Sequence, residues 1–292
     1  MAQKQYSALE QHVISLFPIG KKIKYNNSDY VVVKCDKPRP QGSGECKTDV
    51  YIQITSQVDE SKEEIKISCK LPSNEFQENK INATRAEELF GENWCNIISK
   101  STNAIADRFK QLDVIYPNGY GRTKEGLLTI GWKLEIASKE RTLSAPLLLT
   151  NDEIRDSIYR GVNQLLAKKN SMVNEEIIND SGIANHMLVT DISSLVSYQD
   201  VLLNMVEISK YSIGKHYLIF TGFSYRIKKY KDDGNRPLAV QVIYKADTQN
   251  DCLTHTINFS NPLDANYSGR PMVDKAKIEL NKLSQTYRNQ FI

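Results

Sequence analysis

The sequence predicts an α/β fold of the α+β type, in which helices flank a central mixed β-sheet. Two patterns indicate this class. Residues 47–70 alternate apolar and polar side chains in two runs separated by a polar loop, as expected for two strands that each bury one face. Elsewhere apolar residues recur at helical spacing, as at Ile154, Ile158 and Val162. With 292 residues, 40% of them hydrophobic, the chain is expected to form a single domain, 1–292, with a substantial core.

Composition excludes several classes of protein. The net charge is only +3, so basic residues must gather locally if the chain binds a polyanion. The five cysteines form no Cys-x-x-Cys pair, which argues against a zinc knuckle and a disulfide scaffold and favours the reducing cytoplasm. No run of residues has the apolar length of a membrane-spanning helix, so we expect no membrane partner.

The first expected element is a helix that begins near Ser7 and ends at Pro18. Ser7 and Glu10 have the spacing of a capping box, and Leu9 and Val13 begin an apolar stripe. In this interpretation Glu10 closes the first turn of the helix.

Residues 30–33 predict a strand that leads into a loop rich in Pro and Gly, residues 35–47. The loop carries Arg39 and Lys47 among its basic residues, and Gly42 and Gly44 permit unusual backbone angles. Two interpretations stay open: the loop lies along a nucleic-acid backbone, or it is a solvated connection.

The hairpin expected over residues 47–70 turns near Asp59 and Glu60. An antiparallel pairing about this point places Asp49, at the start of the first strand, opposite Ser68 and Lys70 at the end of the second. A carboxylate and an ammonium held together on a rigid sheet can form a hydrolytic centre. The alternative is a structural ion pair at the end of an ordinary hairpin.

Helices and strands then alternate along the chain. A helical region is expected from Ser73 to the Pro-Asn-Gly stretch at 117–119, followed by a strand over 127–137. Thr150 is expected to cap a further helix. A short strand over 187–189 and a helix over 198–208 follow, and the chain ends with a strand near 254–259 and a basic helix over 273–291.

A second hairpin is expected between residues 216 and 247, because the Asp-Gly dipeptide at 233–234 separates two alternating runs. Its arms carry side chains that can enter a DNA groove or lie along phosphates. These are Arg226, Lys228, Lys229, Arg236, Gln241 and Lys245. The alternative is a solvated sheet edge protected by lysines.

The sequence around the first hairpin resembles the PD-(D/E)xK nuclease superfamily and, within it, the type II restriction endonucleases. The stretch G-x-G-E-C-K-T-D precedes the first strand, and S-C-K-L-P-S-N-E-F closes the second. Asp49 matches the first acid of the motif and Lys70 matches its lysine. Ser68 stands where a second acid is expected, which leaves the number of metal ions open. The resemblance covers about residues 1–100.

This resemblance implies a restriction-endonuclease-like fold, with a catalytic core mainly in 1–140 and added DNA-gripping strands mainly in 141–292. The implied reaction is Mg²⁺-dependent hydrolysis of double-stranded DNA at a short specific sequence, by a monomer or a homodimer. Asp49 and the backbone carbonyl of Cys69 would hold Mg²⁺, Lys70 would steer the attacking water, and Ser68 would make a neutral contact. In many members a helical Glu joins the metal site, which gives Glu10 a second interpretation.

Two other functions stay open. The first is a repair or recombination nuclease of the same superfamily. The second is a non-catalytic DNA-binding protein in which Asp49 and Lys70 form only a structural ion pair.

Overall fold

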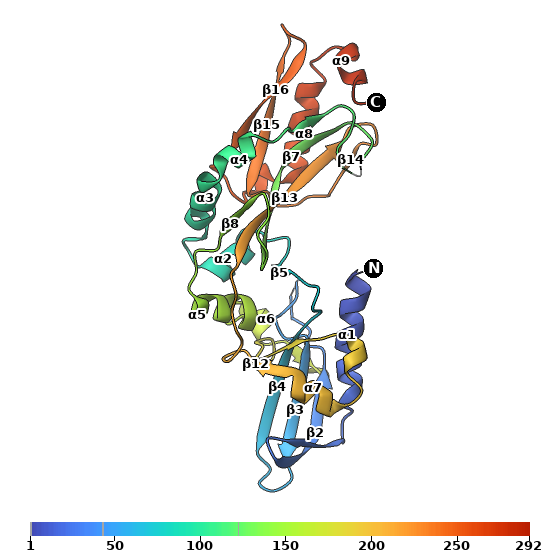
Figure 1. Ribbon diagram of the computed structural model, residues 1–292, viewed down its shortest axis with the longest axis vertical. Coiled ribbons are helices and arrows are strands. Elements are labelled where there is room, and N and C mark those ends of the chain that lie inside the picture. Colours follow the sequence, from blue (N-terminus) through green and yellow to red (C-terminus); the bar gives the residue numbers. More distant parts are fainter. Residues whose placement is uncertain (1, 43, 122) are drawn as a thin grey trace. The chain divides into compact units, whose positions relative to one another are not determined.

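The computed structural model describes residues 2–42, 44–121 and 123–292, with side chains in the first helix described from Ser7 onward. The contacts divide the chain into two compact units (Figure 1). Unit 1 contains residues 1–74 and 149–213, and unit 2 contains residues 75–148 and 214–292. Each unit therefore takes segments from both halves of the chain. This grouping differs from the expected single domain, with a core mainly in 1–140 and additions mainly in 141–292.

Unit 1 is built on a six-stranded mixed sheet of order β1-β2-β3-β4-β11-β12. The strands are β1 (Lys22–Tyr25), β2 (Ser28–Asp36), β3 (Val50–Ser56), β4 (Lys62–Lys70), β11 (His186–Val189) and β12 (Met205–Glu207). Strands β1 to β4 form an antiparallel meander, whereas β11 is parallel to β4 and antiparallel to β12. The expected hairpin of residues 47–70 is confirmed as β3 and β4, and the mixed sheet flanked by helices is confirmed with it.

Helices α1 (Ala2–Leu16) and α7 (Tyr198–Asn204) supply apolar side chains to one core with this sheet. Leu9 and Val13 of α1 are buried against Ile52 and Ile67 of the hairpin. Because α1 begins at Ala2, Ser7 lies inside the helix and the capping box expected for Ser7 and Glu10 is wrong. The residues before Ser7, Ala-Gln-Lys-Gln-Tyr, favour helix on average, so the helix extends one turn further than the capping signal indicated.

The rest of unit 1 is a series of short elements. Thr150 caps α5 (Asn151–Ile154) through a complete capping box with Glu153, as the sequence predicts. A π-helical turn, Arg155–Arg160, follows and ends at Gly161, whose φ of 78° is left-handed. Then come α6 (Leu166–Lys169), the small hairpin of β9 (Met172–Val173) and β10 (Glu176–Ile177), and a 3₁₀ turn, Ile192–Ser194.

Unit 2 contains a second sheet whose main path is β14-β13-β7-β15-β16. These strands are β14 (Lys231–Asp232), β13 (Tyr217–Arg226), β7 (Leu127–Ala137), β15 (Val240–Asp247) and β16 (Cys252–Asn258). Strands β5 (Phe76–Glu78) and β6 (Ile115–Tyr116) pair with β7, and β8 (Ser144–Pro146) pairs with β13. The strand expected over 127–137 is confirmed as β7.

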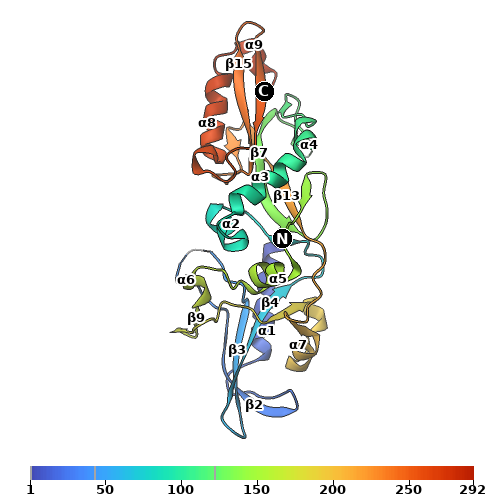
Figure 2. The same cartoon turned by 90° about the vertical axis from the view of Figure 1, so that its left-hand side faces the viewer.

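Five α-helices and one 3₁₀ turn belong to unit 2 among the described residues. They are α2 (Ala83–Phe90), α3 (Trp94–Ala104), α4 (Ala106–Lys110), a 3₁₀ turn at Ala265–Tyr267, α8 (Gly269–Leu280) and α9 (Gln285–Asn289). Helix α8 packs against β15 and β7 (Figure 2). Across the described ranges, none of the helices combines the length and apolar character needed to cross a membrane.

The second expected hairpin is wrong, because β7 lies between its two arms. Leu134 of β7 pairs with Phe220 of β13, and Trp132 of β7 pairs with Val240 of β15. Strand β13 turns instead into β14 through residues 227–230. The core of unit 2 explains the difference: β7 is buried on both faces along most of its length, so pairing on both of its edges satisfies its backbone groups.

Candidate active site

Asp49 stands directly before β3 and is held by the end of β4. Its backbone N–H donates to the carbonyl of Ile67 at 2.8 Å. Its Oδ2 accepts the N–H of Cys69 at 2.8 Å and lies 3.4 Å from the hydroxyl of Ser68. The pairing of Val50 with Ile67 sets this register and places Asp49 opposite Ser68, as the sequence predicts. The carboxylate is therefore fixed by the sheet itself.

The alternation of β4 separates the roles of Ser68, Cys69 and Lys70. Ser68 and Lys70 share the face of Asp49, whereas the Cys69 side chain joins the core beneath α1 and is 5% exposed. Burial raises the pKa of that thiol well above its ordinary value, so it is not a thiolate ligand. The N–H and carbonyl of one strand residue point to the same side, so the Cys69 carbonyl turns toward Asp49.

Two opposing effects act on the ionisation of Asp49. Desolvation by the surrounding protein raises the pKa of its carboxyl group above the ordinary aspartate value. Lys70 opposes this shift most strongly, followed by the Cys69 N–H, Lys37 and Lys47. The site thus combines one half-buried carboxylate with three lysines, a charge pattern suited to a cation and a phosphate side by side.

Glu10 reaches this site from α1. Its side chain is almost buried, and its Oε2 accepts a hydrogen bond from the Lys37 ammonium at 2.6 Å. Burial raises the pKa of the Glu10 carboxyl, Asp49 and Glu45 add to the shift, and the Lys37 hydrogen bond opposes it. Of the two interpretations of Glu10, the structure removes the helix cap and places the side chain within electrostatic reach of Asp49.

Lys37 is a site residue that the sequence prediction missed. Burial lowers its pKa, but the hydrogen bond and charge of Glu10, with Asp49 and Glu45, outweigh burial, so the pKa is raised. The antiparallel order of β2 and β3 could have indicated that Lys37 lies near Asp49. Asp36 at the end of β2 pairs with Tyr51 of β3, so the chain leaves β2 beside the point where Asp49 enters β3.

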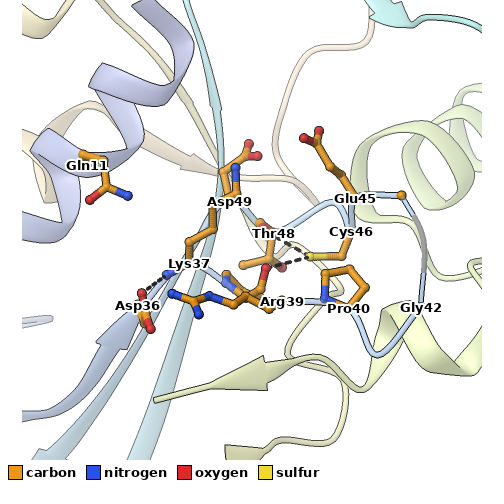
Figure 3. A pocket seen from close by; sticks show the side chains of 12 residues that line it. Gln11, Asp36, Lys37, Arg39, Pro40, Gly42, Glu45, Cys46, Thr48 and Asp49 are labelled. Atoms are coloured by element: carbon orange, nitrogen blue, oxygen red, sulfur yellow. Dashed lines mark hydrogen bonds between the residues drawn. The ribbon is translucent and has the colours of Figure 1, made fainter. Parts of the chain in front are cut away.

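A pocket of about 330 Å³ opens beside Asp49, lined by Gln11 of α1 and residues of the 36–49 loop (Figure 3). Exposed Arg39 is fixed through its backbone, which exchanges hydrogen bonds with Met172 at 2.9 and 2.8 Å. Thr48 is 1% exposed, and among the described residues its hydroxyl has no hydrogen-bond partner. The basic loop expected over 35–47 therefore lies next to the site.

Residues 161–182 support this loop from the other side. The N–H groups of Lys47 and Thr48 lie 3.1 and 3.3 Å from the carbonyl of Gly182, to which they donate. A Cβ on Gly182 would stand 2.0 Å from the Lys168 carbonyl, and one on Gly161 would stand 2.6 Å from Cγ of Lys47. Nothing in the local sequence indicates this support, because it joins residues more than a hundred positions apart.

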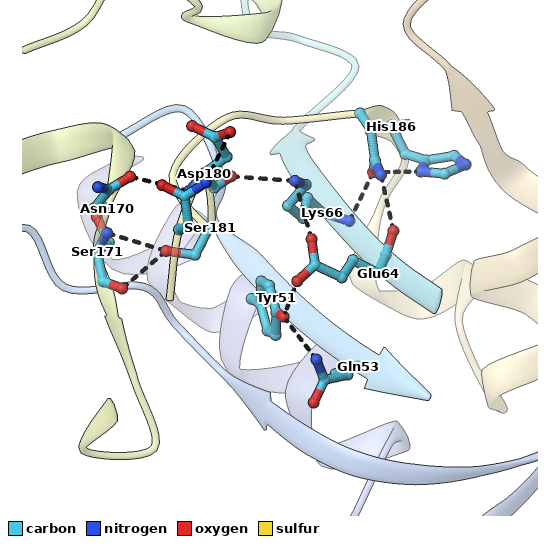
Figure 4. A network of polar contacts seen from close by, with 11 residues as sticks. Tyr51, Gln53, Glu64, Lys66, Asn170, Ser171, Asp180, Ser181 and His186 are labelled. Carbon is cyan, nitrogen blue, oxygen red and sulfur yellow. Dashed lines mark hydrogen bonds and ion pairs between the residues drawn. The ribbon is translucent and has the colours of Figure 1, made fainter. Parts of the chain in front are cut away.

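A polar network stiffens the same face of the hairpin (Figure 4). The Tyr51 hydroxyl donates to Glu64 at 2.5 Å, and Lys66 donates to Glu64 at 3.2 Å and to the Asp180 carbonyl at 3.1 Å. Asn185 accepts the Lys66 N–H at 2.7 Å and donates to the Glu64 carbonyl at 2.8 Å. These bonds tie residues 180–185 to β4 next to the site.

The six residues expected to bind DNA from the second hairpin all lie in unit 2. Gln241 is fully buried; it donates to the carbonyls of Leu238 at 2.9 Å and Asn261 at 2.8 Å and accepts from Asn258 at 2.8 Å. The expectation that it reads DNA is therefore wrong, since its polar atoms are used inside the protein. Val240 and Val242, on either side of it, are buried as well, so both faces of β15 are covered at this point and strand alternation does not indicate that Gln241 is buried.

The other five residues have accessible side chains. Arg226 and Arg236 are half-buried, and Lys228, Lys229 and Lys245 are exposed. Lys229 pairs with Glu125 at 2.5 Å, and Lys228 donates to the Ile292 carbonyl at 3.3 Å. Their contact with DNA stays a prediction.

The donors around Asp49 fit a hard divalent cation in part. Within the described ranges, no three or more His, Cys, Asp or Glu side chains come together as a metal cluster. The available oxygens are the Asp49 carboxylate, the Cys69 carbonyl and the Ser68 hydroxyl, with Glu10 engaged by Lys37. Mg²⁺ is commonly bound by one or two carboxylates together with waters and substrate phosphates, so this set suits Mg²⁺ bound together with substrate.

Comparisons with protein-family models, with curated proteins and with solved structures gave no match for this chain. The resemblance described from the sequence stays a prediction, and the geometry around Asp49 is what supports a function.

Proposed function

We propose that this protein is a Mg²⁺-dependent endonuclease that hydrolyses phosphodiester bonds of double-stranded DNA at a short specific sequence, as type II restriction endonucleases do. One observation carries the proposal: Asp49, Ser68 and Lys70 share one face at one end of the β3–β4 hairpin, with Asp49 held by the Cys69 N–H. This is the arrangement that the motif requires, an acid at the start of one strand and a lysine near the end of the next.

Each residue has a role that follows from its position. Asp49 and the Cys69 carbonyl would hold Mg²⁺, which would supply a Lewis acid that lowers the pKa of a water molecule. Lys70 orients the attacking water and steadies negative charge on the phosphate oxygens. Ser68 adds a neutral hydrogen bond to Asp49. Glu10 supplies a second carboxylate at the same end of the sheet.

The proposed DNA contacts are electrostatic. Arg39 and Lys47 stand on the loop beside the site, where they can neutralise phosphates next to the cleaved bond. In unit 2 the proposed contacts are Arg226, Lys228, Lys229, Arg236 and Lys245. The proposed setting is the cytoplasm, where thiols such as the free Cys35, Cys46, Cys69, Cys95 and Cys252 stay reduced.

The proposal is tested by digesting plasmid DNA with the purified protein, with Mg²⁺ or with EDTA. We expect Mg²⁺-dependent cutting into a fixed band pattern. Asp49→Ala and Lys70→Ala should each lower the rate by at least about 100-fold, because each removes a charge that acts in the transition state. Asp59→Ala and Lys62→Ala are matched controls at the opposite end of the same hairpin and should cut normally.

Each other result points to another function. Smeared or branch-specific cutting would favour a repair or recombination nuclease. Binding without cutting would favour a DNA-binding protein. Full activity in Asp49→Ala or Lys70→Ala would remove this site from the reaction.

Ser68 gives a graded test of the same assignment. Its hydroxyl makes one neutral hydrogen bond to Asp49, at 3.4 Å. Such a bond contributes about 1 kcal/mol, so Ser68→Ala should slow cutting by less than about tenfold. Ser68→Asp restores the acid that the motif usually has and should keep activity. A loss in Ser68→Ala as large as that in Asp49→Ala would give Ser68 a direct role in binding the cation.

A further inference from the structure

Lys37 forms an ion pair with Glu10 inside the candidate site, and the proposed reaction gives Lys37 no role. The Lys37 ammonium lies 2.6 Å from Oε2 of Glu10, whose side chain is 10% exposed, whereas the Lys37 side chain is 34% exposed. Asp49 and Glu45 also act on the charge of Lys37. Figure 3 shows the Lys37 side chain extending toward Asp49 along the wall of the pocket. The Lys37 ammonium thus interacts with carboxylates from two elements, Glu10 of α1 and Asp49 at the start of β3.

We propose that Lys37 is an internal counter-cation, which occupies the space between Glu10 and Asp49 in the metal-free protein and competes with a divalent cation for these carboxylates. The inference rests on the proposed function in one respect: it takes Asp49 as a ligand of the cation.

Burial explains why a cation is needed there at all. A carboxylate that is removed from water is unfavourable unless it is paired, and Glu10 is both buried and repelled by Asp49. Lysine suits the role because its charge is compact and its four-carbon stem is flexible. Lys37 borders the pocket, so its ammonium can leave Glu10 and move into open space without disturbing the core.

Competition follows from the same charges. A divalent cation that approaches Asp49 meets the positive charge of Lys37, and it gains Glu10 as a ligand only after the ammonium has moved away. A DNA phosphate in the pocket would attract the released ammonium, which frees Glu10 for the cation. Because such coupling is reciprocal, DNA and cation should each strengthen the binding of the other. The site would then bind its cation weakly until DNA is present.

The test measures the affinity of the DNA-free protein for Mn²⁺ by calorimetry. Lys37→Met should bind Mn²⁺ at least about tenfold more tightly than the wild type, because the competing charge is gone. Lys34→Met is the matched control, since Lys34 is on β2, three residues before Lys37, and pairs with Glu176. Its affinity should stay within about twofold of the wild type. Equal or weaker binding by Lys37→Met would overturn the inference.

A second pair of variants covers a failure of Lys37→Met to fold. Glu10→Gln with Lys37→Gln replaces the ion pair by a neutral hydrogen-bonded pair and is compared with Glu10→Gln alone. The double variant should bind Mn²⁺ more tightly, because only it lacks the charge that repels the cation from Asp49; equal affinity would overturn the inference.

The proposed function is separated from this inference by adding Asp49→Ala to Lys37→Met. If the added change leaves Mn²⁺ affinity unaltered, Asp49 is not a ligand and the site assignment fails. If it abolishes binding while Lys37→Met alone matches the wild type, the site stands and Lys37 is not its counter-cation.

Discussion

At Asp49, desolvation and three lysines act in opposite directions on one carboxyl group. Desolvation prevails, so the metal-free protein holds this carboxylate at a cost in stability. Asp59, at the turn of the same hairpin, is the reverse case: hydrogen bonds with Ser56 and Ser61 lower its pKa to about 2. The two aspartates of this hairpin therefore act on stability in opposite directions: ionised Asp49 lowers it and ionised Asp59 raises it. A site prepared for a cation requires a carboxylate that lacks full compensation, and of the two only Asp49 is in that state.

Asp49→Asn should raise the free energy of unfolding of the metal-free protein at pH 7. Because folding raises the pKa of the Asp49 carboxyl, its contribution to stability is fully present below the unfolded pKa, about 3.9, where the group is protonated. That contribution is lost as the pH rises through the folded pKa and the carboxyl ionises inside the protein. The advantage of the variant should therefore shrink as the pH falls from 7 through the folded pKa and should be largely lost at about 4. Urea unfolding in EDTA at pH 7 and pH 4 measures it.

Asp59→Asn is the control of opposite sign. Its lowered pKa gives stability above the unfolded pKa that is lost as the pH falls toward about 2. This variant should therefore be less stable than the wild type at pH 7. If both substitutions changed stability in the same direction, the electrostatic account of Asp49 would be wrong.

At the scale of elements, the loop that carries Lys37, Arg39 and Lys47 is positioned by a segment from the second half of unit 1. Gly161 ends the π-helical turn in a left-handed conformation, and Gly182 accepts the N–H groups of Lys47 and Thr48. Glycine is needed at 161 both for its φ and for the close approach of Lys47. The site loop is thus ordered by packing and not by its own sequence.

Gly161→Ala should destabilise the protein by about 1–3 kcal/mol, because alanine is strained at this φ and its Cβ would meet Lys47. Gly42→Ala is the matched control on the loop itself, since φ there is ordinary and the nearest atom to an added Cβ is 4.0 Å away. It should change stability by less than about 0.5 kcal/mol. Urea unfolding measures the free energy of unfolding of both variants. Equal losses would show that residue 161 does not require glycine.

At the scale of the whole molecule, the candidate site belongs to unit 1, and the basic residues of β13 and its turn belong to unit 2. The chain passes from one unit to the other after residues 74, 148 and 213. If the proposed function is right, unit 1 supplies the chemistry and unit 2 adds affinity for DNA.

Replacing both Lys228 and Lys229 by alanine should weaken binding to every duplex and flatten its salt dependence. Each phosphate contact releases condensed counterions and contributes about 0.9 to the slope of log K against log salt, so the loss is at most about 2. Lys229 already pairs with Glu125, so its share should be the smaller. Binding isotherms on one duplex across a salt series measure the slope.

The control is the pair Lys110→Ala and Lys139→Ala, exposed lysines of unit 2 that are paired with Asp107 and Glu75. Equal loss of slope in the two double variants would indicate a diffuse charge effect and not contacts at the β13 turn. An unchanged slope in the Lys228 and Lys229 variant would make that turn an ordinary solvated edge.

The sequence by itself determined the β3–β4 hairpin, the strand β7 and the cap at Thr150, because each depends on alternation or capping within a short stretch. It also placed Asp49 opposite Ser68, since a hairpin with a short loop fixes its own register. Tertiary structure decided the rest. It inserted β7 between β13 and β15, buried Gln241, and brought Lys37 to Glu10 and Gly182 to Lys47. Most of these outcomes depend on which distant segment covers a buried strand or an unpaired carboxylate, and local propensity carries no information about that choice.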